Sequence, residues 1–205
     1  MVTEAAPKQG WADKLAIREL IESWVIWRDM GDWERLRSIW HPGGLMAASW
    51  REGTAEEFIE GNRLSFNSGL DILHQLGGTT VTLSEDHLKA VTMTKMVISQ
   101  RAVIHDVLCE VAAQARHLDR WEKREDRWGL VDRKTIFDRD RLETVRQGTV
   151  VNLDQAMLSS FPEPYQHLGY LQASLGYPVR KDLPHLRSAA ADEALDEAQR
   201  WLADA

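Results

Sequence analysis

Cysteine, long apolar runs and excess positive charge are all scarce in this sequence of 205 residues, and each scarcity excludes a class of protein. The single cysteine, Cys109, excludes an intramolecular disulfide and a cysteine-based zinc site. No stretch approaches the roughly 20 apolar residues of a membrane span. The net charge of -7 argues against a nucleic-acid partner, because no basic stripe is present to neutralise phosphates. The N-terminus lacks the basic start and apolar run of a signal peptide, so a cytoplasmic protein is expected.

Signatures of the common metal and cofactor enzymes are also missing. The seven histidines are scattered without HxH or HExxH spacing, and there is no GxSxG, phosphate-binding glycine loop or dinucleotide fingerprint. We therefore expect no metal and no cofactor. Tryptophan, by contrast, is abundant, with nine residues. Tryptophan builds large cores and also lines pockets for flat ligands, and core packing is expected to explain most of the nine.

The order of periodic segments predicts an α+β fold. Helical periodicity extends over about residues 12–30, ends at Gly31, and resumes after Asp32, which is a suitable N-cap. The motif HPGG is expected to end this second helix, residues 45–50 to form a short strand, and REG to form a turn. Thr54 and Glu57 then form a capping box at the start of a third helix.

From about residue 70, four long segments rich in valine, threonine and isoleucine follow one another without helices between them. This pattern predicts an antiparallel sheet, with a hairpin around KREDR. Two helical patterns follow the sheet. We divide the chain into a loose tail at residues 1–10, an α+β domain at residues 11–150 and a C-terminal helical extension at residues 151–205.

One carboxylate interrupts the apolar pattern of the first predicted helix. The apolar stripe includes Ile17, Ile21, Trp24 and Val25, and Asp29 stands four residues after Val25 on the same edge. Burying a carboxylate is costly unless a partner is present. Asp29 therefore either pairs with a group in the fold or is a solvated residue at the end of the helix.

Three stretches in this order resemble the SnoaL-like branch of the nuclear transport factor two-like superfamily. They are IRELIESWVIWRDMGDWERLRSIWHPGG, HQLGGTTVTLSEDHLKAVT and ARHLDRWEKREDRWGLVDRKTIFDRD, within about residues 12–141. The resemblance implies a cone-shaped fold in which a curved antiparallel sheet wraps the N-terminal helices around a deep pocket. It also implies one of several activities, most of them free of cofactors: dehydratase, isomerase, polyketide cyclase, dehydrochlorinase or non-catalytic binding module.

The resemblance implies that Asp29 and His74 form a catalytic dyad inside the pocket. In several enzymes of the family, an aspartate late in the first helix faces a histidine at the start of a strand. A carboxylate bonded to one imidazole nitrogen fixes the tautomer and raises the basicity of the other nitrogen, so His74 would act as a general base. The alternative is a strand histidine half in water.

Arg133 matches an arginine that family dehydratases often keep after a tryptophan-led strand. Alternation places it on one face with Val131, Thr135 and Phe137. On that face it needs an anionic or carbonyl partner, either Asp29 or a substrate oxygen. The alternative is an ion pair at the sheet edge with Asp132, Asp138 or Asp140.

Further substrate-binding candidates are Trp24, Trp50 and Arg101. Trp24 stands where some dehydratases of the family carry a tyrosine that polarises a carbonyl, and an indole donates a hydrogen bond but is not an acid. A core position is the alternative for Trp24. Arg101, near the end of an apolar strand, either lines the pocket or extends to the sheet edge.

These features predict a cofactor-independent lyase of the dehydratase type, acting on an apolar, ring-bearing or aromatic small molecule. The alternatives are an isomerase or cyclase, a lyase that releases formaldehyde from aromatic dimers, and a binding module without chemistry. A homodimer is expected, because the outer face of the sheet needs cover. The helix predicted around residues 161–177 either closes the pocket as a lid or packs on the outside of the sheet or on a partner subunit.

Overall fold

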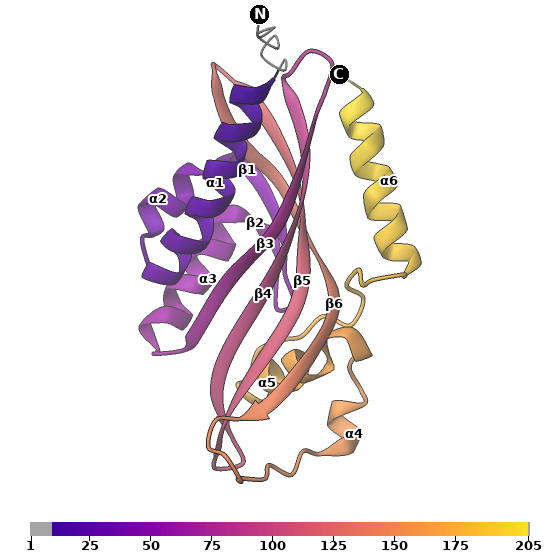
Figure 1. The fold of residues 1–205 in the computed structure, drawn as a ribbon. Helices are drawn as coiled ribbons and strands as arrows, with labels where there is room; N and C mark the ends of the chain where they lie inside the picture. Colours follow the sequence, from indigo (N-terminus) through magenta and orange to yellow (C-terminus); the bar gives the residue numbers. More distant parts are fainter. Residues whose placement is uncertain (1–9, 205) are drawn as a thin grey trace, which may run out of the picture.

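The computed structural model describes residues 10–204, which form one curved sheet with helices on both sides (Figure 1). The N-terminal helices are α1 (Trp11–Met30), α2 (Trp33–Ser38) and α3 (Ala55–Asn67). The strands are β1 (Trp40–Ala47), β2 (Glu52–Thr54), β3 (Asp71–Leu83), β4 (Lys89–Ile104), β5 (Val107–Arg124) and β6 (Arg127–Thr144). The C-terminal part contains α4 (Gln155–Leu158), the short 3-10 helix η1 (Glu163–Tyr165), α5 (Gln166–Ser174) and α6 (Ala189–Ala203). The predicted α+β class, with a C-terminal helical extension, is confirmed.

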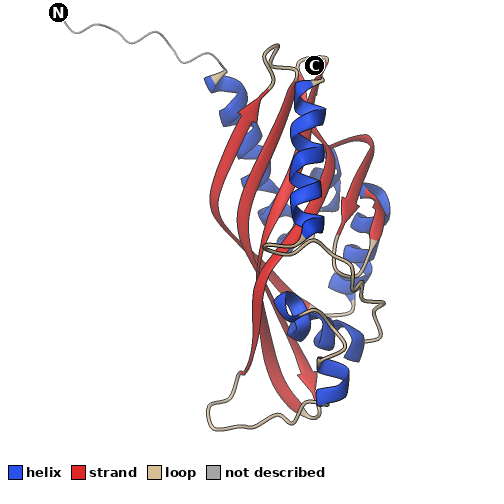
Figure 2. Cartoon of the chain, turned by 90° about the vertical axis from the view of Figure 1, so that its right-hand side faces the viewer, coloured by secondary structure: helices blue, strands red, loops and turns tan. Residues whose placement is uncertain are grey.

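The four long strands predicted after residue 70 are present and pair in sequence order. β3, β4, β5 and β6 are antiparallel neighbours, and the predicted hairpin joins β5 to β6. β1 then joins β6 in parallel, and β2 forms an edge, which gives the order β2-β1-β6-β5-β4-β3. The sheet is strongly twisted and stays open, because β2 and β3 are both edges (Figure 2).

The first strand begins earlier than the sequence predicted. Helix α2 ends at Ser38, and β1 starts at Trp40, where it pairs with Leu130. The pairing is irregular through the HPGG motif and resumes at Leu45, while Gly43 adopts φ 80°. The proline and glycines therefore distort a strand instead of preceding one. The predicted turn at residues 51–53 is partly the edge strand β2.

Helix α1 packs its apolar stripe on one face of the sheet, which we call the inner face. Ile17, Ile21 and Trp24 are buried in one cluster with Trp121 and Leu130 of the strands. Gly31 ends the helix with φ 74°, in the left-handed region that glycine adopts without strain. The end of α1 lies against the edge strand β3, where Asp29 contacts His74.

The C-terminal extension covers parts of both faces. Helix α5 lies on the inner face beyond the reach of α1, where Leu168 and Leu171 pack on Val111 and Phe137. Of the alternatives stated for this helix, packing on the outside of the sheet is therefore wrong for α5. It applies instead to α6, which packs Ala194 and other small residues on the outer face (Figures 1 and 2). The outer face near α6 is thus covered within the same chain.

Candidate active site

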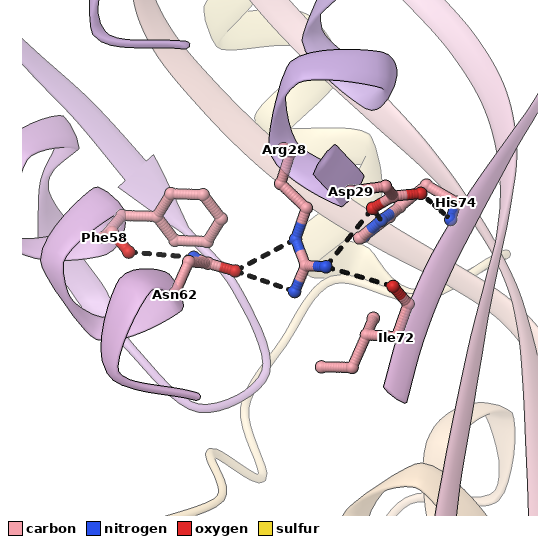
Figure 3. A network of polar contacts seen from close by, with 6 residues as sticks. All are labelled: Arg28, Asp29, Phe58, Asn62, Ile72 and His74. Atoms are coloured by element: carbon pink, nitrogen blue, oxygen red, sulfur yellow. Dashed lines mark hydrogen bonds and ion pairs between the residues drawn. The ribbon is translucent and has the colours of Figure 1, made fainter. Parts of the chain in front are cut away.

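The structure brings together the two residues that the sequence nominated as a dyad. Asp29 lies in the last turn of α1, and His74 lies near the start of β3 (Figure 3). One carboxylate oxygen, Oδ2, accepts the backbone N–H of His74 at 2.6 Å, and the other, Oδ1, lies 2.8 Å from Nδ1 of the same residue. Both carboxylate oxygens therefore bind one residue, which fixes the position of its imidazole ring.

The charge states of the pair follow from these contacts. Burial alone would raise the pKa of Asp29, but the hydrogen bonds from His74 and the charge of Arg28 outweigh it, and the pKa is lowered. Asp29 is therefore a carboxylate that only accepts, so Nδ1 of His74 must carry the ring proton. Burial lowers the pKa of His74, against the opposing effect of Asp29, and Arg28 and Arg133 lower it further. His74 is thus neutral at pH 7, with a free lone pair on Nε2.

A buried arginine that the sequence did not reveal holds Asp29 from the other side. Arg28 is 5% exposed, and its Nη1 donates to Asp29 Oδ1 and to the carbonyl oxygen of Ile72, at 3.2 Å each. Its Nε and Nη2 both donate to Oδ1 of Asn62, at 3.1 and 2.9 Å (Figure 3). Asn62 is itself fixed by a bond to the carbonyl oxygen of Phe58. The network joins α1, α3 and β3 around the dyad.

Arg133 lies on the inner face, as alternation predicted, but with a different partner. It is 1% exposed, and its Nε and Nη2 bind the two carboxylate oxygens of Asp119 at 2.7 Å each. The predicted partners, Asp29 or an aspartate near the sheet edge, are wrong. Asp119 is fully buried on β5, directly opposite Arg133 on β6. A bidentate pair of this kind neutralises both charges and fixes the guanidinium plane.

Trp24 connects the dyad to Arg133. The guanidinium carbon of Arg133 lies 4.6 Å from the centre of a Trp24 ring, and the imidazole of His74 meets the indole edge-on at 5.2 Å. His117 packs on the same indole at 5.3 Å. Burial and the nearby charge of Arg133 hold the pKa of His117 well below its usual range, so this ring is neutral.

Two hydrogen-bond donors in this cluster have no acceptor. Within residues 10–204, neither Nη1 of Arg133 nor Nε1 of Trp24 has a hydrogen-bond partner, although both atoms are buried. Buried donors are nearly always paired, so two unpaired donors next to a fixed histidine call for an explanation.

Of the remaining predicted residues, Trp50 lies on the inner side and Arg101 does not. Trp50 stacks on Phe58 at 5.7 Å and packs on Tyr177 of the C-terminal extension. Arg101 shares its parity with Val91 and Met93, which point to the outer face, and it binds Glu110 there at 2.6 Å. The prediction that Arg101 lines the pocket of the dyad is therefore wrong.

Open space near the dyad is small. A cavity with room of about 30 Å³ adjoins the network at Arg28, Asn62 and Ile72. Two grooves have far more room. One of about 560 Å³ lies beside Trp40, and one of about 590 Å³ lies on the outer face, where Leu73, His74 and Arg101 line it, although the imidazole of His74 binds Asp29 on the inner side. The side chain of His74 is only 7% exposed. A ligand larger than a water molecule must therefore displace part of the surrounding structure to reach the dyad.

The described part of the chain contains no cluster of three or more histidine, cysteine or acidic side chains arranged to hold a metal ion. Among residues 10–204, no helix combines the length and the apolar character needed to cross a membrane.

Comparison with known proteins identifies the family. The family of the SnoaL-like domain matches residues 10–134, and the chain belongs to this family. This confirms the resemblance to the nuclear transport factor two-like superfamily and its cone-shaped fold. Pea pathogenicity protein 2 of Fusarium vanettenii is 30% identical over 93% of this chain and 85% of its own length. An uncharacterised Emericella nidulans protein, AN9274, is 32% identical over 86% of this chain and 78% of its own length.

Solved structures share the fold at low sequence identity. A protein assigned as a scytalone dehydratase from Novosphingobium aromaticivorans has a TM-score of 0.55 at 12% identity, over 68% of this chain and 96% of its own. A type 2 hexachlorocyclohexane dehydrochlorinase has a TM-score of 0.56 at 13% identity, over 69% of this chain and 94% of its own. At these identities the likeness concerns the fold alone.

Proposed function

We propose that this protein is a cofactor-independent lyase of the dehydratase type, with His74 as the general base. The observation that carries the proposal is the double contact of Asp29 with the backbone N–H and Nδ1 of His74. It leaves Nε2 as the only free nitrogen of a neutral imidazole, beside an indole and an arginine with unpaired donors. A base, its orienting carboxylate and a set of donors are what a proton-abstracting elimination requires.

Each residue of the site has its own role in the reaction. Nε2 of His74 takes a proton from a carbon atom, and the electron pair of that bond forms the new double bond as the neighbouring C–O bond breaks. The imidazolium then returns the same proton to the leaving hydroxyl, which departs as water, and His74 is neutral again. Asp29 stabilises the imidazolium that forms. Nη1 of Arg133 and Nε1 of Trp24 donate to the oxygen on which negative charge develops. Each buried arginine is already matched by a carboxylate, Arg28 by Asp29 and Arg133 by Asp119, so the site suits an uncharged substrate.

The aromatic surroundings support an apolar, ring-bearing substrate. Trp24 and Trp50 both stack on Phe58, and Trp50 also packs on Tyr177 of the C-terminal extension. Flat apolar surfaces of this kind accommodate rings. An isomerase, a cyclase or a lyase that releases formaldehyde would use the same base, and they differ from a dehydratase in which bond of the substrate breaks.

One observation favours a second candidate, a binding module without chemistry. The dyad is buried, and the adjoining cavity has room for about 30 Å³. In a module, Asp29 and His74 would be a structural polar pair, and the ligand would need no contact with Nε2.

Screening separates these candidates. The protein is incubated with a set of apolar ring-bearing alcohols, and mass spectrometry detects loss of water or of formaldehyde. We expect conversion by the wild type and a reduction of about 10²-fold or more in His74→Ala. His87→Ala, in a turn away from the dyad, is the matched control and should keep its activity. A module would convert none of the compounds, or would convert them equally well without His74.

We also propose a homodimer that uses the part of the outer face that α6 leaves open. Leu73, Val103 and Leu108 are exposed there, and they flank the ion pair of Arg101 with Glu110. Exposed apolar side chains gathered on one sheet face are typical of association surfaces.

A further inference from the structure

The small cavity near Arg28 is closed by the C-terminal extension, which lies beyond the part of the chain that the family matches. One wall comes from α1, α3 and β3. The rest of the lining comes from β4, which contributes Gln100, and from the extension, which contributes Gln172 of α5 and Tyr177. Its lining includes Arg28, Trp50, Asn62, Gln100, Gln172 and Tyr177.

Gln172 is the least satisfied polar residue of this lining. Its side chain sits on a helix that is otherwise packed by leucine and tyrosine, and the residue is only 7% exposed. Within residues 10–204, its Oε1 atom has no hydrogen-bond partner. Gln100, 1% exposed, lines the same cavity from the sheet. A buried carboxamide with an unused acceptor is unfavourable for folding, so its presence needs another reason.

The size and chemistry of the cavity define what fits. Room for about 30 Å³ admits one water molecule or one hydroxyl group, and no ring. Carboxamides donate and accept hydrogen bonds, as a hydroxyl does. The nearby charge of Arg28 is matched by Asp29, so the cavity offers no net charge to an ion. The carbon frame of a ligand would lie outside this space, in a groove of about 610 Å³ that shares Trp50, Ser65 and Tyr177 with the cavity.

The backbone that carries Gln172 is held in a fixed position. The start of α5 is fastened to β6 by Asp140, whose oxygens lie 2.7 Å from Nδ1 of His167 and from the backbone nitrogen of Leu168. Ser65 of α3 and Tyr177 join their hydroxyls at 2.9 Å on the other side of the cavity. These contacts fix the backbone on both sides of Gln172 before a ligand arrives, which reduces the entropy lost on binding.

We propose that this cavity is a subsite for an uncharged hydroxyl group of the ligand, and that Gln172 of the C-terminal extension is its recognition residue. That this ligand is the substrate rests on the proposed function, whereas the binding of a hydroxyl does not. Specificity would then depend on a part of the chain outside the SnoaL-like domain.

The test uses the full chain and two probes of equal shape, phenol and toluene, at millimolar concentration. The side-chain amide signals of Gln100 and Gln172 are followed by ¹⁵N NMR. We expect phenol to shift both signals and toluene to shift neither. Gln172→Met, of similar size but without the carboxamide, should weaken phenol binding by about threefold or more, the loss of a neutral hydrogen bond. The melting temperature of Gln172→Met should equal or exceed that of the wild type, because the variant lacks the buried carboxamide oxygen that has no hydrogen-bond partner.

Gln166→Met, the same change at the first residue of α5, is the control and should bind phenol like the wild type. The proposal is overturned if phenol leaves the amide signals unchanged, if toluene shifts them equally, or if Gln172→Met lowers the melting temperature without changing phenol binding. His74→Ala separates this test from the proposed reaction, since it should keep the phenol-dependent shifts. If no alcohol is converted in the screen but the shifts remain, the reaction is wrong and the subsite stands.

Discussion

Replacing Asp29 with asparagine tests the reasoning about the dyad without a substrate. In the wild type both carboxylate oxygens accept, one from the backbone N–H of His74 and one from Nδ1–H. Asparagine offers one acceptor and one donor. If its oxygen keeps the backbone N–H, its amide N–H faces Nδ1, and the ring proton must move to Nε2. His74 would then carry its proton on Nε2, the nitrogen that must accept a proton from the substrate.

The expected magnitudes follow from the bonds that are lost. The variant loses charge-assisted bonds to His74 and to Arg28, while Arg28 keeps Asn62 and Ile72. Hydrogen bonds to charged groups contribute about 1.5–3 kcal/mol, so we expect the free energy of unfolding to fall by about 2–4 kcal/mol. For a chain of this size that lowers the melting temperature by about 5–15 °C. Any turnover should fall by about 10²- to 10⁴-fold.

The assay is ¹⁵N NMR of the imidazole nitrogens, which reports the tautomer, together with urea unfolding. We expect the Nδ1–H tautomer in the wild type and the Nε2–H tautomer in Asp29→Asn. Asp32→Asn, three residues later at an N-cap where asparagine serves equally well, is the control and should change neither. A wild-type ring that carries its proton on Nε2 would refute the reasoning, as would an unchanged tautomer in the variant.

Three further predictions follow from the same structure. Arg133→Met leaves the buried Asp119 carboxylate without a charged partner, so urea unfolding should show a free energy of unfolding lower by about 3–5 kcal/mol. Arg37→Met removes an exposed ion pair and should lower it by less than about 1 kcal/mol. Burial lowers the pKa values of His117 and His74 in the folded state, so the unfolded chain takes up protons at a higher pH than the folded protein. The stability that the two neutral rings contribute is therefore complete above a pH of about 6.5, and it is lost as the pH falls from there toward their folded pKa values. His117→Gln should reduce the slope of stability against pH below that point by about 1.4 kcal/mol per pH unit, and an unchanged slope would contradict the assignment. Sedimentation should show a dimer at micromolar concentration that Leu73→Asp weakens, while a wild-type monomer would exclude the proposed interface.

Local patterns in the sequence determined most of the elements. The apolar period of α1, the capping box at Thr54 and the four alternating segments after residue 70 each depend on neighbours within a few residues, so they could be predicted. The secondary structure of the HPGG motif was harder to predict. Proline and glycine usually interrupt structure, and only pairing with β6 shows that here they lie within an irregular strand.

The residues of the candidate site also fall into two groups, those that the sequence indicated and those that it did not. Asp29 stood out because a carboxylate continued an apolar stripe, and the family resemblance nominated His74. Arg28 and Asn62 gave no such signal, because nothing local distinguishes a buried arginine or asparagine from an exposed one. Their role depends on α1, α3 and β3 meeting at one point.

One extra residue in β6 determines which residue of β5 lies opposite Arg133. The hairpin pairs Arg124 with Arg127, and counting evenly from that pair would place Leu118 opposite Arg133. A register shift between Arg120 and Trp121 moves the pairing by one, so that Asp119 faces Arg133 on the inner side. A one-residue shift exchanges the two faces of a strand, and the bulge that causes it is fixed by packing over the whole sheet. The sequence by itself therefore determined that Asp29 and Arg133 carry charge toward the interior, and only the tertiary structure decided that Arg28 and Asp119 are buried with them as partners.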